Sequence, residues 1–382
     1  MQVNARTNVG SPAAAAAAAR VAEESQSIVA PRKSEKKGVR MRWFRIAAFV
    51  LCFFLFGRTL AHADLHAAYS RIRDVGPLAF IIPLPFLFVM MADAWTWQRL
   101  LRALGHKARL HRLLRVRFAI EAITNTVPIG GLWADTLGPA LVSMTTGIAV
   151  ADVFAASTAK RWVLIRMHSA YVTLSAAFGS AAILGASMNL VGNHALLVFV
   201  LLSALGLVLT SMGIEAIASR GQVAGRVARL LSRLRLQRVQ TWISARHHHF
   251  AYADAQLGRL STDVAATRAA SFRLAFFWLL EGFETFLILR LLGAPLSLID
   301  VMSFDAALSV VRSVAIFAPA GIGVQDVGYL AVLEAYGVPD AHAIGPAFIV
   351  LKRLKEAFWV LFGFAMLATL RKRKAKTSFR LT

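Results

Sequence analysis

Long apolar segments constrain this chain more than any other feature of its sequence. A helix that crosses a bilayer needs ~20 mainly apolar residues. Six stretches meet this requirement: 43–60, 76–97, 162–184, 195–218, 272–292 and 344–370. With 57% apolar and 16% charged residues in 382, the composition agrees with bilayer as the solvent and excludes a soluble enzyme.

Two further apolar stretches, 118–146 and 298–336, are each interrupted near the middle by proline and glycine. We call them the first and second hairpins, because each is expected to enter the membrane and return to the same side. The fold class predicted is therefore all-α: a polytopic membrane protein with about six spanning helices and two opposed re-entrant, broken helical hairpins in an inverted repeat.

The formal net charge of +23 is spread between the apolar segments and forms no single groove, which argues against a nucleic-acid partner. Residues 98–117 hold seven Lys or Arg and no acid, and residues 219–270 hold nine against two acids. Since basic loops stay on the cytoplasmic side, we expect a multi-pass protein of the cell inner membrane with both termini cytoplasmic.

These patterns predict the organisation of the whole chain. We expect a disordered basic cytoplasmic tail at 1–42, a first membrane half at 43–220 and a basic cytoplasmic linker at 221–270. A second membrane half at 271–370 and a short basic tail at 371–382 complete the chain.

The two interruptions share a pattern, Pro-x-Gly with an Asp seven residues after the Pro. They are Pro128, Gly130 and Asp135 in the first hairpin, and Pro319, Gly321 and Asp326 in the second. A basic pair follows each Asp at nearly the same distance, Lys160-Arg161 and Lys352-Arg353. This recurrence indicates an inverted-topology repeat.

Proline removes a backbone donor and glycine permits positive φ, so the hairpin tips expose polar backbone groups that lipid cannot satisfy. We expect the tips to line a shared site, where helix N-termini suit an anionic headgroup. The residues expected to bind it are Pro128, Gly130, Gly131, Asp135, Arg161, Arg312, Pro319, Gly321, Gly323, Gln325, Asp326, Lys352, Arg353 and Glu356. The alternative is that both breaks are tight turns between short packed helices.

Charged residues within the last span give a second indication, because such residues are costly in lipid. Glu356 can pair with Lys352 or Arg353 and leave the other basic group for a ligand; the alternative is a closed structural ion pair. Asp305, Ser309 and Arg312 form one polar stripe on the second hairpin. Glu281 and Glu284 could pair with the basic groups or relay protons, but we expect them mainly to act as partners in helix packing. Lys160 and Arg161 are flanking charges if their span begins at Trp162.

We expect no cofactor and no metal site. The consecutive residues His247, His248 and His249 point in different directions on a helix, and Cys52 is the single cysteine. The spans contain no evident His-acid pair or nucleophile, so the sequence predicts that the chain is not an enzyme.

These motifs resemble the flippase-like transmembrane region of the lysylphosphatidylglycerol synthases, and within it the hopanoid-biosynthesis-associated membrane proteins. The similarity is strongest in Pro319-Ala-Gly-Ile-Gly-Val-Gln-Asp326 and in Lys352-Arg-Leu-Lys-Glu356. It implies a lipid-translocating helical domain. The sequence departs from the family pattern at Gly138-Pro139 and at Lys160-Arg161, and after Leu370 nothing resembles the soluble aminoacyl-transferase domain of the full synthases.

The leading hypothesis is a transporter or flippase-like protein that moves a polar-headgroup lipid, namely a phospholipid, an aminoacyl lipid or a hopanoid. Alternatives are a membrane-embedded lipid-modifying enzyme with Asp135 or Asp326 as base, and an accessory subunit of a lipid-biosynthesis complex. Expected partners are membrane lipids with anionic headgroups; lipid-biosynthesis enzymes and a second copy of the chain stay open.

Overall fold

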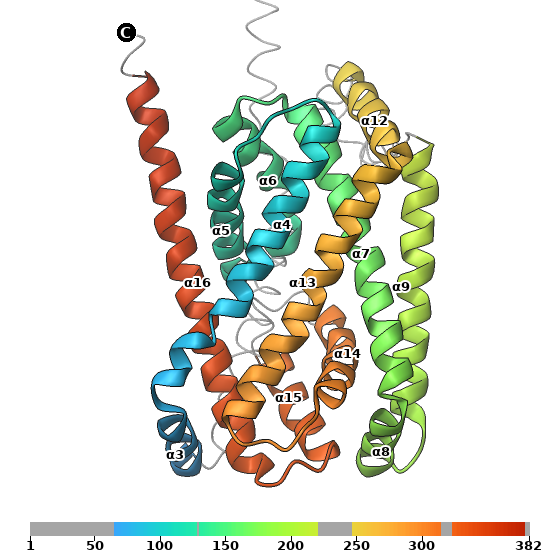
Figure 1. Cartoon of the computed structure of the whole chain (residues 1–382), viewed down its shortest axis with the longest axis vertical. Helices are drawn as coiled ribbons and strands as arrows, with labels where there is room; N and C mark the ends of the chain where they lie inside the picture. Colours follow the sequence, from blue (N-terminus) through green and yellow to red (C-terminus); the bar gives the residue numbers. More distant parts are fainter. Residues whose placement is uncertain (1–64, 128–129, 221–246, 315–322, 379–382) are drawn as a thin grey trace, which may run out of the picture. The chain divides into compact units, whose positions relative to one another are not determined.

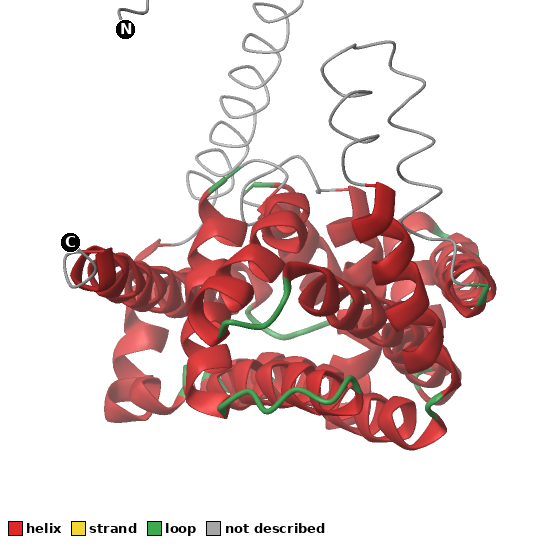
Figure 2. Cartoon of the chain, turned by 90° about the horizontal axis from the view of Figure 1, so that it is seen from above, coloured by secondary structure: helices red, strands yellow, loops and turns green. Residues whose placement is uncertain are grey.

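The computed structural model describes residues 65–127, 130–220, 247–314 and 323–378, and every regular element within these ranges is a helix (Figure 2). The elements are α3 (Leu65–Val75), the 3-10 helix η1 (Gly76–Ile81), α4 (Leu84–Ala103), α5 (Leu110–Thr126), α6 (Gly130–Thr146), α7 (Val150–Phe178), α8 (Ser180–Val191), α9 (Ala195–Ser219), α12 (His247–Thr262), α13 (Val264–Leu291), α14 (Leu298–Val314), α15 (Val324–Ala335) and α16 (Ala341–Ser378). The predicted tail 1–42 and span 43–60 lie outside the described residues, as do Pro128, Pro319 and Gly321.

Among the described helices, two stretches are long and apolar enough to cross a membrane: His66–Ala103, which ends with α4, and Ala195–Ile217 in α9. The bent pair α7 and α8 makes a third if it counts as one span. Helices α13 and α16 have 28 and 38 residues, but both carry charged side chains in their apolar runs. The all-helical prediction is confirmed, whereas the number of six spans is not.

The predicted span 162–184 is not one straight helix. Helix α7 ends at Phe178 and α8 begins at Ser180, with a bend of 78° between them. The bend is at Gly179, where an added Cβ would overlap with the side chain of Ser303 in α14. Close packing of α14 at this glycine therefore accompanies the turn of the chain, which the apolar sequence alone could not reveal.

Both predicted hairpins contain a pair of helices with the break at the expected place. Helices α5 and α6 pack together and are separated by residues 127–129, and α14 and α15 pack together and are separated by residues 315–323. Figure 1 shows α5 and α6 toward one end of the bundle and α14 and α15 toward the other. Helix α5 begins at Leu110, so part of the basic stretch 98–117 is helical.

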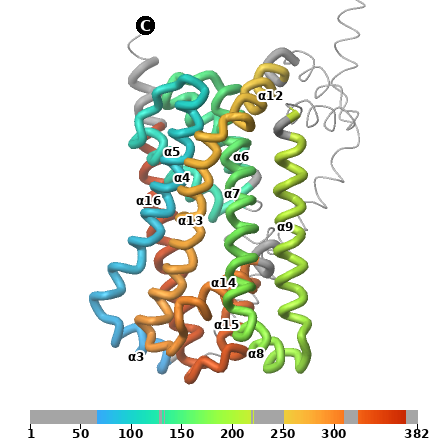
Figure 3. The backbone as a smooth tube through the Cα atoms, turned by 45° about the vertical axis from the view of Figure 1, so that its right-hand side comes forward, coloured from blue at the N-terminus to red at the C-terminus, as the bar shows by residue number. Residues whose placement is uncertain are grey.

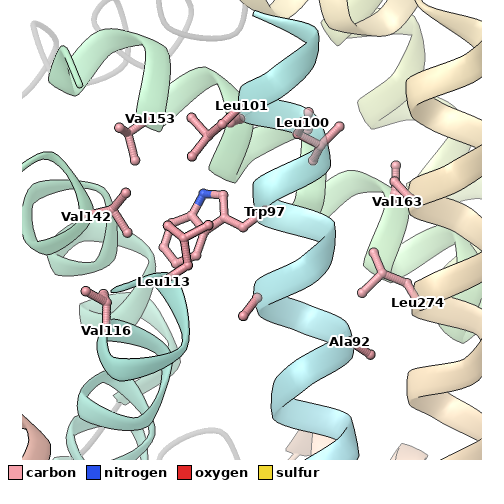
Figure 4. Packing of buried hydrophobic residues seen from close by; sticks show 14 of the residues in the cluster. Ala92, Trp97, Leu100, Leu101, Leu113, Val116, Val142, Val153, Val163 and Leu274 are labelled. Atoms are coloured by element: carbon pink, nitrogen blue, oxygen red, sulfur yellow. The ribbon is translucent and has the colours of Figure 1, made fainter. Parts of the chain in front are cut away.

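Packing joins the two halves of the chain along their length. Helices α4 and α13 lie side by side and α16 packs on α5, and these contacts join the two halves (Figure 3). Within the first half, α9 packs on α7. Trp97 of α4 is buried and lies among Leu113, Val116 and Val142 from α5 and α6 (Figure 4). Tight side-chain contact of this kind is the main source of helix association in lipid.

The end of the predicted linker belongs to this packed bundle. Ala253, Leu257 and Leu260 of α12 are buried, and α12 packs on α7 and α9. Asp263 follows α12 and caps α13, because its carboxylate accepts a hydrogen bond of 2.8 Å from the backbone N–H of Ala266. Helix α13 consequently begins at Val264, before the predicted span at 272–292.

Candidate functional site

A buried ion-pair network connects three helices of the first half. One carboxylate oxygen of Asp93 in α4 accepts from Nζ of Lys160 in α7 at 2.8 Å and lies 2.9 Å from Nε of Arg117 in α5. The Asp93 residue is 3% exposed. Because a buried charge is tolerated only when it is paired, these contacts fix the relative positions of α4, α5 and α7.

Glu121 extends this network on α5. Its carboxylate accepts from Nη1 of Arg117 at 2.7 Å and from the side-chain amide of Asn125 at 2.8 Å. Lys160 also lies over the ring of Trp97, with Nζ 4.2 Å from the ring centroid. The two carboxylates, Asp93 and Glu121, therefore balance the two positive charges of Arg117 and Lys160.

Asp135 and Arg161 form a second, more open ion pair beside this network. Their carboxylate and guanidinium groups are 3.3 Å apart, and the side chains are 48% and 51% exposed. A cavity of about 130 Å³ is lined by Asp135, Arg161, Gly131 and the network residues Asp93 and Lys160. One accessible arginine of α7 therefore lies at a small cavity beside the first hairpin.

The second half contains a comparable buried pair. Nζ of Lys355 in α16 donates to Glu284 of α13 at 2.7 Å, and Nζ of Lys352 is 4.0 Å from the same oxygen. Both lysines and Glu284 are buried. Lys352 also lies over the rings of Tyr329 and Phe348, at 5.2 and 5.7 Å from their centroids.

Asp326 of the second hairpin forms a short ion pair with Arg353 of α16. Nε and Nη2 of Arg353 donate to one oxygen of Asp326 at 3.2 and 2.6 Å, and Nη1 donates to Glu356 at 2.6 Å. The other oxygen of Asp326 accepts from the backbone N–H of Gly323 at 2.8 Å. Glu356 therefore bonds to Arg353, and Lys352 lies near Glu284.

The ion pairs of the two halves have matching positions in the sequence. Asp93 and Glu284 are 191 residues apart, as are Asp135 and Asp326. Asp93 and Glu284 each lie close to a lysine, Lys160 on α7 and Lys352 on α16, and each hairpin aspartate pairs with the arginine that follows that lysine. The correspondence adds a matched pattern of contacts to the matched Pro-x-Gly motifs.

The structure brings the expected site residues together in two groups. Gly130 begins α6, and Gly131, Asp135 and Arg161 line the first-half cavity. Gly323, Asp326, Arg353 and Glu356 form one bonded cluster, with Gln325 in the first turn of α15 and Lys352 one residue before Arg353 on α16. The side chain of Arg312 and both hairpin tips lie outside the described residues. Asp305 in α14 accepts a bond of 3.2 Å from the hydroxyl of Tyr171.

Asp93 and Arg117 are the residues that sequence reasoning missed. Asp93 is the single charged residue of the apolar stretch 76–97. Because charged residues within the membrane are usually paired, its position was a signal that could have identified it. Arg117 closes a basic run and was interpreted as a flanking charge, although its side chain is 15% exposed and bonded to two acids. Lys160 is not a flanking charge either, because α7 begins at Val150.

Long apolar helices that bury paired charges define a helical membrane protein. A family model described as the lysylphosphatidylglycerol synthase TM region matches residues 42–364, and the chain belongs to this family. The protein is therefore a membrane protein of lipid metabolism or transport. No curated protein matches the chain.

This membership corrects one expectation. The sequence predicted that the chain is not an enzyme, but the family is named for a synthase, which places the chain in an enzyme family. The prediction was wrong because it rested on the lack of an evident nucleophile or His-acid pair within the spans, and a lipid-modifying family need not carry its chemistry in a motif of that kind.

Proposed function

We propose that the protein moves a lipid with a polar, anionic headgroup across the membrane, and that the cavity at the first hairpin receives the headgroup. The observation that carries this proposal is the position of Arg161, half-exposed at a cavity that residues of the buried ion-pair network also line. A phosphate or carboxylate can replace Asp135 at this guanidinium, because arginine binds both groups with two parallel hydrogen bonds.

The matched ion pairs support a transport cycle. The Asp135–Arg161 pair is accessible, whereas the corresponding Asp326–Arg353 pair is buried. In an inverted repeat, alternating access follows when the two halves exchange these arrangements. We infer that Arg353 and Lys352 bind the headgroup when the second hairpin opens, and that both chain ends stay on the cytoplasmic side.

The lipid class follows from the charge of the site and from the family. An anionic phospholipid or an aminoacyl lipid fits a site built on arginine and lysine, and a hopanoid with a polar headgroup is the other candidate. The acyl or polycyclic part stays in the bilayer while the headgroup passes between the hairpins.

Reconstitution tests the proposal directly. The purified protein is placed in vesicles that contain phosphatidylglycerol labelled on one acyl chain, and movement between leaflets is followed by chemical quenching of the outer label. We expect faster movement than in protein-free vesicles, and Arg161→Gln should remove most of this gain. Arg290→Gln, on an exposed position at the end of α13, is the matched control and should behave as wild type.

Equal rates with and without protein for every lipid tested would contradict transport. Equal rates for Arg161→Gln and wild type would contradict the assigned cavity.

A second candidate is a lipid-modifying enzyme, which the family name favours. Asp135 is the better base of the two aspartates, because its side chain is 48% exposed and Asp326 is buried and bonded to Arg353. Mass spectrometry of the lipids extracted from the same vesicles separates the two candidates: transport leaves the lipid masses unchanged, and modification does not.

A further inference from the structure

A groove separate from the hairpin cavity lies where α12 meets α13. Its volume is about 820 Å³, which is enough for a lipid headgroup. The side chains that matter for its chemistry are Trp95, Trp162, Arg166, Glu215, Arg268 and Arg273. It shares no lining residue with the cavity at Asp135 and Arg161.

The groove carries an excess of positive charge. Arg166 bonds to Glu215, which leaves Arg268 and Arg273 without an acid of the groove to balance them. Two such arginines at one groove favour an anion, and the guanidinium group suits phosphate best.

Two arginines of the groove, Arg166 and Arg273, each lie over the ring of a tryptophan. The guanidinium carbon of Arg273 is 4.9 Å from the ring centroid of Trp95, and that of Arg166 is 5.6 Å from the ring centroid of Trp162.

An apolar stripe leads away from the groove along α13. Phe272, Phe276, Leu279 and Phe283 are exposed and follow one another at intervals of three or four residues, so they share one face of the helix. Phe272 also lines the groove. A molecule with a phosphate at one end and an acyl chain at the other fits this continuous surface better than free phosphate does.

We propose that this groove binds one anionic glycerophospholipid as a resident lipid, with its phosphate at Arg268 and Arg273 and an acyl chain along the stripe on α13. The bound lipid connects α12 and α13 to α4 and α7, which all contribute to the groove. It is distinct from the lipid proposed for transport and does not depend on that proposal.

Native mass spectrometry of the full-length protein in mild detergent tests the site. Phosphatidylglycerol and phosphatidylcholine with the same acyl chains are titrated separately, and we expect tight binding of one phosphatidylglycerol. Arg268→Gln should weaken this binding ~10-fold, as expected for the loss of a charge-assisted hydrogen bond. Arg268 is exposed, so the variant should fold, and Arg290→Gln is the control at the far end of the same helix.

A spectroscopic measurement locates the bound lipid. Phosphatidylglycerol with a nitroxide near its headgroup should quench Trp95, so the quenched fraction should fall in Trp95→Phe. The site would be overturned by equal affinity for the two lipids, by an unchanged affinity in Arg268→Gln, or by unchanged quenching in Trp95→Phe. Competition by millimolar inorganic phosphate would show that the groove binds phosphate alone and would overturn the assignment of a lipid.

Discussion

Arg353 donates two hydrogen bonds to a single carboxylate oxygen of Asp326, a residue in another helix and 27 positions earlier in the chain. The bond to Glu356 uses the third nitrogen of the guanidinium group. In this conformation each of the three nitrogens of the arginine already donates to a carboxylate, so a headgroup at this position competes with Asp326 and Glu356 for the guanidinium group.

This geometry changes the expected effect of Arg353→Gln. The sequence alone allowed Glu356 to pair with Lys352 and leave Arg353 for a ligand, and in that arrangement the variant would fold normally and lose transport. Asp326 is 1% exposed, and loss of its partner leaves a buried charge, which typically costs ~3–5 kcal/mol. We expect a lower melting temperature than for Glu356→Gln, since Glu356 is partly exposed.

The control is the double variant Arg353→Gln with Asp326→Asn, which removes both charges. It should recover much of the lost stability. A double variant no more stable than Arg353→Gln would show that the ion pair is not the cause.

The first-half network predicts an order of effects. Asp93→Asn leaves Lys160 without its acid and should destabilise the protein by ~3–5 kcal/mol. Lys160→Gln should cost less, because Asp93 keeps its contact with Arg117. Chemical unfolding in detergent measures the order, with Asp74→Asn at an exposed position as the control. The reverse order would mean that Arg117 does not compensate Asp93.

A close helix crossing gives a third prediction. An added Cβ at Gly363 of α16 would overlap with the backbone carbonyl of Phe118 in α5. Gly363→Ala should therefore force the two helices apart and cost ~1–3 kcal/mol, as overpacking does. Gly206→Ala in α9 has open space and should be neutral or slightly stabilising. Thermal unfolding that is the same in both variants would argue against tight packing of α5 on α16.

The orientation of the two halves is testable by labelling. In a Cys52→Ser background, cysteine at Lys107 should react with an impermeant reagent only in opened cells, whereas cysteine at Pro295 should react in intact cells. Both positions are exposed in the structure. Reaction of both from the same side would contradict the opposed hairpins.

Local features of the sequence predicted the helices well. The break before Gly130 and the start of α15 after Gly323 follow from proline and glycine, which act within a few residues. The bend at Gly179 could not be predicted in this way, because its correlate is Ser303 on a helix far along the chain.

The site was predictable only in part for the same reason. Arg353 and Glu356 are neighbours on one helix, so the sequence predicted that Glu356 pairs with either Arg353 or Lys352. The pairing of Asp93 with Lys160 joins positions 67 residues apart, so it depends on how α4 and α7 pack. Arg117 was assigned to a cytoplasmic flank because hydropathy counts charges and carries no information on their partners.

The unequal state of the Asp135–Arg161 and Asp326–Arg353 pairs has a practical consequence. The single structure therefore contains an open and a buried form of two aspartate–arginine pairs that occupy matching positions in the sequence. If the proposed inverted repeat is correct, threading the sequence of each half onto the backbone of the other would build a starting model of a second conformation, with Arg161 enclosed and Arg353 accessible.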